Sequence, residues 1–143
     1  MKVVRALLLL SLAVLPVSIS AQQYFSYSGA RRIVKFRIRP GKAADFYKYA
    51  AAVIKVLQAE KDAGLIVDFG MAHTVDFVGE DKYDVSLYIT YKDMATFDTL
   101  SDKAEPIVAK TYGTAEKRAA MGKLADESSE VVSSELVRAI VIK

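Results

Sequence analysis

The sequence predicts an α+β fold in which one antiparallel sheet carries helices on one of its faces. Two observations lead to this prediction. Some segments alternate polar and apolar side chains with a period of two, which is typical of half-buried strands. Other segments repeat apolar residues at helical spacing, which indicates helices with one buried side. Along the chain they follow the order strand, helix, strand, strand, helices, strand.

The first strand is predicted at residues 31–39, where basic and apolar side chains alternate. Pro40 and Gly41 end it, because both residues interrupt regular structure. A helix is predicted at residues 42–61, since Ala-rich content favours a helix and apolar side chains recur along one side. That apolar side consists of Phe46, Ala50, Val53 and Leu57.

The second half of the chain predicts two strands, a group of short helices and a last strand. The strands are expected at residues 65–78 and 83–91, joined by a turn at 79–82. Asp93 and Thr114 are suited to cap helices that follow them. The helices are expected at residues 94–100, 106–113 and 115–130, and the last strand at 133–142. This order is a βαββαβ pattern and predicts a ferredoxin-like sheet.

The N-terminus has the order of a secretory signal peptide. A basic start with Lys2 and Arg5 precedes an apolar run, and small residues follow near Ala21. We expect a signal peptide at residues 1–21, an N-terminal arm at 22–30 and one domain at 31–143. The protein is then periplasmic or secreted, without stable membrane insertion after cleavage. The alternative is an uncleaved anchor, but the apolar run is short for a membrane span.

Composition excludes several classes of function. Of the 20 basic residues two lie in the predicted signal peptide, so 18 remain against 17 acidic ones. A nearly neutral chain has no overall field to attract nucleic acid, and we expect no nucleic-acid partner. The chain has one His and no Cys, so a zinc site of the usual ligands is not expected. We expect no metal and no cofactor.

The face of the sheet turned away from the helices is the feature most relevant to function. If Val34, Phe36 and Ile38 face the helices, Lys35 and Arg37 face away. Charges of both signs then share this face with apolar residues. The members expected on it are Ile33, Lys35, Arg37, Asp84, Tyr88, Leu136, Arg138 and Ile140. Either the face is an ordinary solvated one with cross-strand ion pairs, or two copies meet there as a homodimer and enclose a cavity.

Five residues are candidates for a site. His73 is the one side chain that titrates near neutral pH, so it is the candidate general base. A histidine at the edge of the core, bonded to backbone, is the alternative. Arg37, Asp68, Tyr88 and Arg138 are candidates for ligand binding. Equally, Asp68 would pair with a strand cation such as Lys35, Arg37 or Arg138, and Tyr88 would serve packing.

Several motifs resemble the dimeric α/β-barrel proteins, including antibiotic-biosynthesis-monooxygenase-like and NIPSNAP-like domains. They are Arg39-Pro40-Gly41-Lys42 with the helix start Ala43-Ala44-Asp45-Phe46, the hairpin from Phe77-Val78-Gly79 to Tyr83-Asp84-Val85, and Tyr91-Lys92-Asp93-Met94-Ala95-Thr96-Phe97-Asp98 after the third strand. The segment Ser133-Ser134-Glu135-Leu136-Val137-Arg138 resembles the last strand of small exported bacterial members without an assigned function.

The resemblance implies a homodimer and a pocket between sheet and helices, but no single activity. Some members are cofactor-free oxygenases, some degrade haem and some isomerise their substrates, and none of their catalytic motifs is matched here. Three functions therefore stay open. The protein binds a small molecule in that pocket, or it is a cofactor-independent oxygenase or isomerase with His73 as base, or it is a structural protein whose sheet face is only a dimer seam.

Overall fold

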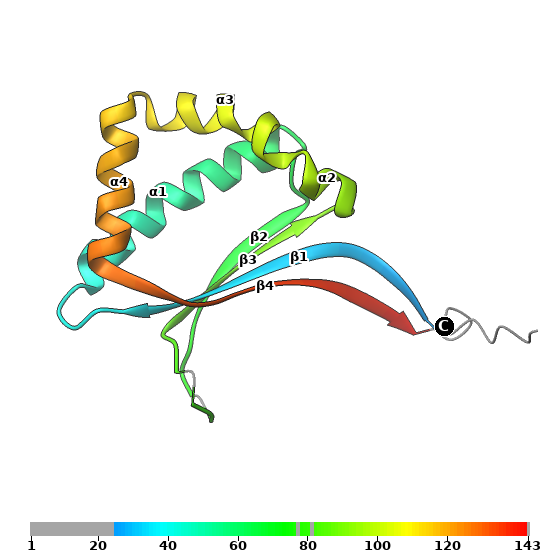
Figure 1. Cartoon of the computed structure of the whole chain (residues 1–143), viewed down its shortest axis with the longest axis horizontal. Helices are drawn as coiled ribbons and strands as arrows, with labels where there is room; N and C mark the ends of the chain where they lie inside the picture. Colours follow the sequence, from blue (N-terminus) through cyan, green and yellow to red (C-terminus); the bar gives the residue numbers. More distant parts are fainter. Residues whose placement is uncertain (1–24, 77, 81, 143) are drawn as a thin grey trace, which may run out of the picture.

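The computed structural model describes residues 25–76, 78–80 and 82–142 (Figure 1). The predicted signal peptide lies outside these residues. The order of elements is β1 Phe25–Ile38, α1 Ala43–Asp62, β2 Asp68–His73, β3 Val85–Tyr91, α2 Met94–Asp98, α3 Leu100–Tyr112, α4 Ala115–Ser128 and β4 Ser129–Ile142. The strands form one antiparallel sheet in the order β2-β3-β1-β4. The predicted ferredoxin-like α+β fold is confirmed.

The core lies between the sheet and α1, and all four helices lie on the same side of the sheet (Figure 1). Phe46 of α1 is fully buried, and its ring centroid is 5.7 Å from that of Phe36 on β1. Ala50 and Leu57 continue the buried side of α1, as the apolar spacing predicts. Helices α3 and α4 pack against α1. No helix among the described residues is long and apolar enough to cross a membrane.

Two irregularities in the β1–β4 ladder change which side chains share a face. Ser28 pairs with Ala139 whereas Arg31 pairs with Val137, so β1 holds one extra residue there, at Gly29 with φ of 58°. This is a β-bulge, in which glycine takes the left-handed conformation. Near Val132 the extra residue lies on β4.

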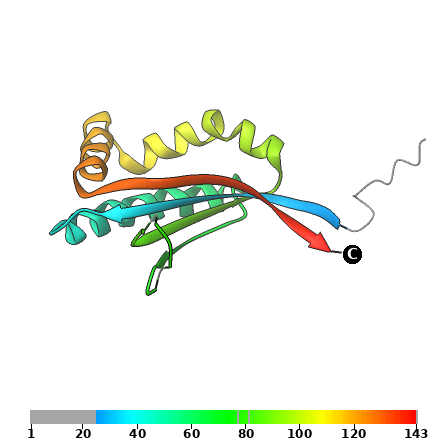
Figure 2. The same ribbon diagram turned by 60° about the horizontal axis from the view of Figure 1, so that its bottom comes forward.

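β1 begins at Phe25, so the second part of the predicted arm belongs to the sheet. β1 and β4 run together past the ends of β2 and β3 (Figure 2). Tyr27 pairs with Ile140 in this extension, and both side chains are exposed. This pairing was not predicted from the sequence, because residues 22–30 are too polar for the expected alternation.

Helix starts are predicted better than strand lengths. Asp93 accepts a hydrogen bond from the backbone N–H of Thr96 at 2.7 Å, and Thr114 accepts one from Lys117 at 3.3 Å, as expected of N-caps. Helix α3 begins at Leu100 and continues through Pro106, which was expected to start it. β2 ends at His73 rather than at residue 78, because the chain then leaves β3 for an exposed loop.

Candidate functional site

The open face is the side of the sheet opposite the helices, and no described element covers it (Figure 1). Paired residues in an antiparallel ladder place their side chains on the same face. The strand register therefore identifies the residues whose side chains lie on the open face. Its members are Arg31, Ile33, Lys35 and Arg37 of β1, Asp68 and Gly70 of β2, Ser86, Tyr88 and Thr90 of β3, and Glu130, Ser133, Glu135 and Val137 of β4.

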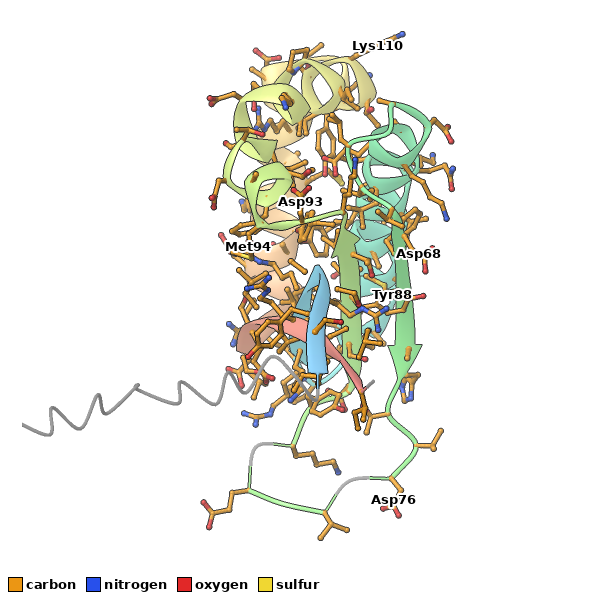
Figure 3. The ribbon with its side chains drawn as sticks, turned by 90° about the vertical axis from the view of Figure 1, so that its right-hand side faces the viewer. Asp68, Asp76, Tyr88, Asp93, Met94 and Lys110 are labelled. Atoms are coloured by element: carbon orange, nitrogen blue, oxygen red, sulfur yellow. The ribbon has the colours of Figure 1, made fainter. Side chains whose placement is uncertain are left out.

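Tyr88 of β3 pairs with Gly70 of β2, and Figure 3 shows Tyr88 beside Asp68. A Cβ added at Gly70 would be 2.6 Å from Cε1 of Tyr88 and 2.7 Å from its hydroxyl oxygen, so the ring covers the glycine. The Tyr88 hydroxyl donates to Oδ2 of Asp68 at 3.3 Å. Glycine at position 70 thus allows the aromatic ring to lie flat on the sheet.

Two cations flank this pair. Lys61 at the end of α1 donates to Oδ1 of Asp68 at 2.9 Å. Its hydrogen bond holds the pKa of the Asp68 carboxyl below its usual range. On the β1 side the Arg31 guanidinium lies 5.0 Å from the centroid of the Tyr88 ring, and its Nε donates to Thr90 Oγ1 at 3.1 Å. Asp68 therefore pairs with a helix cation and not with the strand cations that its position in the sequence suggested.

The other half of the open face is a set of cross-strand ion pairs. Lys35 contacts Glu135 at 3.0 Å, and Ser133 also donates to Glu135. Arg37 Nη1 contacts Glu130 at 2.6 Å, while its Nε and Nη2 donate to the carbonyl oxygen of Lys82. All three nitrogens of Arg37 have partners, which favours the solvated-face interpretation for this residue over a ligand-binding role.

A hollow of about 570 Å³ opens beside Arg31 and Thr90. It forms where the bulge at Gly29 bends the β1–β4 pair away from β3, and a Cβ there would be 3.1 Å from the Tyr91 carbonyl oxygen. Its walls are mostly apolar, with cations at the rim. The main lining residues are Arg31, Ile33, Val67, Thr90, Lys92 and Val137. Arg31 and Thr90 pair across β1 and β3 on the open face, and the hollow lies where the bulge interrupts β1 next to them.

The structure separates the remaining predicted site residues from this cluster. His73 ends β2, pairs with Val85 on the helix side and is exposed, and it lines none of the described cavities. Arg138 was expected on the open face. Its guanidinium instead lies 4.5 Å from the Tyr27 ring centroid, and it has the parity of Leu136, which pairs with the helix-side Arg32.

Two acidic residues lie near the β2–β3 connection. Asp84 has the parity of Ser86 on the open face, and its Oδ2 accepts the backbone N–H of Ile38 at 2.7 Å, at the end of β1. Asp76 is exposed in the loop after β2, at the opposite end of the sheet from Asp68 in Figure 3. No group of three metal-ligating side chains occurs among the residues that the structure describes.

Other cavities lie on the helix side. A crevice of about 380 Å³ lies between the sheet and α4. Its rim carries the charged residues Arg39, Asp126 and Glu130. A second cavity of about 450 Å³ lies between α1, α3 and α4 and includes Tyr49, whose pKa is raised mainly by burial.

Comparisons with known proteins support the fold. Neither family models nor curated proteins match the chain. Among solved structures, a protein from Shewanella oneidensis matches with a TM-score of 0.52 and 12% identity, over 82% of this chain and 98% of its own. A protein from Thermobifida fusca, described as dimeric, ferredoxin-like and of unknown function, matches with a TM-score of 0.50 and 18% identity, over 82% and 95%. These likenesses define the class of the chain as ferredoxin-like.

Proposed function

We propose that the chain acts as an exported homodimer in which two open faces meet and the hollow beside Arg31 holds a small molecule. The observation that carries the proposal is the open face itself, where apolar residues and a hollow lie on a sheet surface that no described element covers. Val137 at the wall of the hollow is 37% exposed. An uncovered apolar sheet surface of this kind is typical of an interaction site. The dimeric description of the Thermobifida protein supports the same arrangement.

The dimer is tested by light scattering of the mature chain at micromolar concentration. We expect twice the mass of one chain. Val137→Lys should give a monomer, because it buries an ammonium group beside Arg31 in the interface. Val75→Lys is the matched control, since Val75 is 97% exposed in a loop and its substitution should leave the dimer intact. A wild-type monomer contradicts the proposal.

The hollow suits a compact, largely apolar molecule with a polar group directed at Arg31, Thr90 or Lys92. Its volume of about 570 Å³ lies within the range of small-molecule sites, roughly 300–1,000 Å³. Native mass spectrometry of protein purified from its host should show a bound species. Val67→Trp fills the hollow and should remove that species, whereas Val75→Trp should not. The same occupancy in the Val67→Trp variant would place the ligand elsewhere.

Export is tested separately on the full-length chain. We expect the protein in the periplasmic or culture fraction, with a mature N-terminus at Gln22. N-terminal sequencing of the exported product checks this. An intact Met1 in the isolated protein would favour the uncleaved anchor.

A further inference from the structure

A groove between α1 and α4, on the helix side of the sheet, has an apolar floor and a basic rim. Its volume is about 500 Å³. Small residues form the floor, so that a ligand can lie close to the helix backbones. The floor consists of Ala51, Ala52, Ala120 and Met121, and the rim carries Lys48, Lys55 and Lys117.

The ammonium groups of the three rim lysines have no hydrogen-bond or ion-pair partner among the described residues. Lys48 and Lys55 lie two helical turns apart, on one side of α1. No acidic side chain lines the groove. Two other lysines, at the two ends of α1, are paired: Lys42 with Asp45 and Lys61 with Asp68. The groove therefore combines unneutralised positive charge with apolar surface.

A second cavity, in the interior of the helical layer, adjoins the groove. Tyr112 and Met121 line both this groove and the 450 Å³ cavity between α1, α3 and α4. That second cavity is mainly apolar on its α1 side, where it is lined by Val53, Val56 and Leu57. An extended apolar chain that lies on the alanine floor thus has an apolar region at its inner end and cations at its outer end.

From this arrangement we propose that the groove binds a single-chain anionic amphiphile, a long-chain carboxylate. The carboxylate contacts the ammonium groups of Lys48, Lys55 and Lys117. The alkyl chain lies along the alanine floor toward Tyr112 and Met121. Charge complementarity selects the head group, and burial of the chain supplies most of the affinity. The site is on the opposite side of the sheet from the open face, so it does not depend on the proposed dimer or on its hollow.

The test uses laurate, below its critical micelle concentration, with the mature chain in isothermal titration calorimetry. We expect saturable binding of one laurate per chain and none of dodecyltrimethylammonium, which has the same chain length and a cationic head. Replacing Lys48, Lys55 and Lys117 by Gln should weaken binding by roughly 10- to 100-fold, because each exposed charge pair contributes roughly a factor of two to five. Ala51→Trp fills the groove and should abolish binding.

A control variant removes three positive charges from lysines outside the groove. Replacing Lys103, Lys110 and Lys123 by Gln should leave laurate affinity unchanged. Val67→Trp, in the open-face hollow, should also leave laurate affinity unchanged. The proposal of a ligand in the hollow and the proposal of laurate in the groove can therefore fail independently of each other. Circular dichroism verifies that each variant is folded.

Four outcomes overturn the proposal. They are no binding of laurate, equal binding of the cationic surfactant, unchanged affinity in the Lys48, Lys55 and Lys117 variant, and unchanged affinity in Ala51→Trp. Co-sedimentation with anionic but not neutral vesicles, together with no laurate binding, would show instead that the lysines contact a membrane surface.

Discussion

Replacing Gly70 by Ala tests the contact between this residue and the ring of Tyr88. Measured in the wild-type background alone, the substitution should change the free energy of unfolding very little, because opposing contributions nearly cancel. The added methyl group would lie 2.6 Å from Cε1 and 2.8 Å from Cζ of Tyr88, closer than carbon atoms approach one another. Since Gly70 has no left-handed backbone angle, alanine is otherwise compatible with its conformation. The half-buried ring must therefore move off the sheet.

The size of the effect follows from the contacts that the moved ring loses. The hydrogen bond to Asp68 contributes about 0.5–1.5 kcal/mol, and the Arg31 contact about 0.5–1 kcal/mol at an exposed site. Alanine also stabilises the folded protein by about 0.4–1 kcal/mol where the backbone conformation of the glycine suits it, because alanine restricts the unfolded chain. The net change in the wild type is thus small. In a Tyr88→Ala background, only the stabilising part remains.

A double-mutant cycle separates these contributions. Urea unfolding of the wild type, Gly70→Ala, Tyr88→Ala and the double variant, at one protein concentration, should give a coupling free energy of about 1–2 kcal/mol. The equal concentration matters because the proposed dimerisation would also contribute to apparent stability. A coupling energy of zero, with Gly70→Ala equally stabilising in both backgrounds, would refute the described packing of the ring.

Three further predictions concern single residues. Asp93→Ala removes the cap on the Thr96 N–H and should cost about 1 kcal/mol in urea unfolding, whereas Asp93→Asn should retain most of the stability. Phe46→Ala should cost about 3–5 kcal/mol because the ring is fully buried, and Tyr47→Ala, at an exposed neighbour, should cost far less. Burial raises the pKa of Glu60, so the unfolded chain ionises first as pH rises and stability falls. Glu60→Gln should therefore stabilise the protein at neutral pH but not below the usual carboxyl pKa, as thermal unfolding at both pH values would show.

Much of the fold was predictable because its signals are local. The apolar side of α1 depends only on the spacing from Phe46 to Leu57, and the caps Asp93 and Thr114 depend on residues three positions away. The order of these elements then restricts the sheet to few topologies. Strand lengths were less predictable, since the end of β2 at His73 depends on where its partner β3 ends.

The site was predictable only in part, because register is not a local property. Tyr88 was correctly expected on the open face, yet its contact with Asp68 requires that Gly70 lie opposite Tyr88. Arg138 was assigned to the wrong face because position 138 has no local sign of which parity of β4 faces the helices. A one-residue shift in pairing moves every side chain beyond it to the other face of a strand.

The basic side chains between Arg31 and Arg39 are close together in the sequence but lie on both faces of the sheet in the folded protein. Lys35 and Arg37 contact glutamates of β4, which lie about a hundred positions further along the chain. Arg32 lies on the opposite side, with its guanidinium 5.0 Å from the Phe97 ring centroid, and its buried Nε has no hydrogen-bond partner among the described residues. The charges of this strand are thus divided between two faces, and those of Lys35 and Arg37 are matched by glutamates. On α1 and α4, by contrast, the three lysines Lys48, Lys55 and Lys117 border one groove that no acidic side chain lines. An anionic ligand is therefore better sought on the helices than on the strand that is richest in arginine.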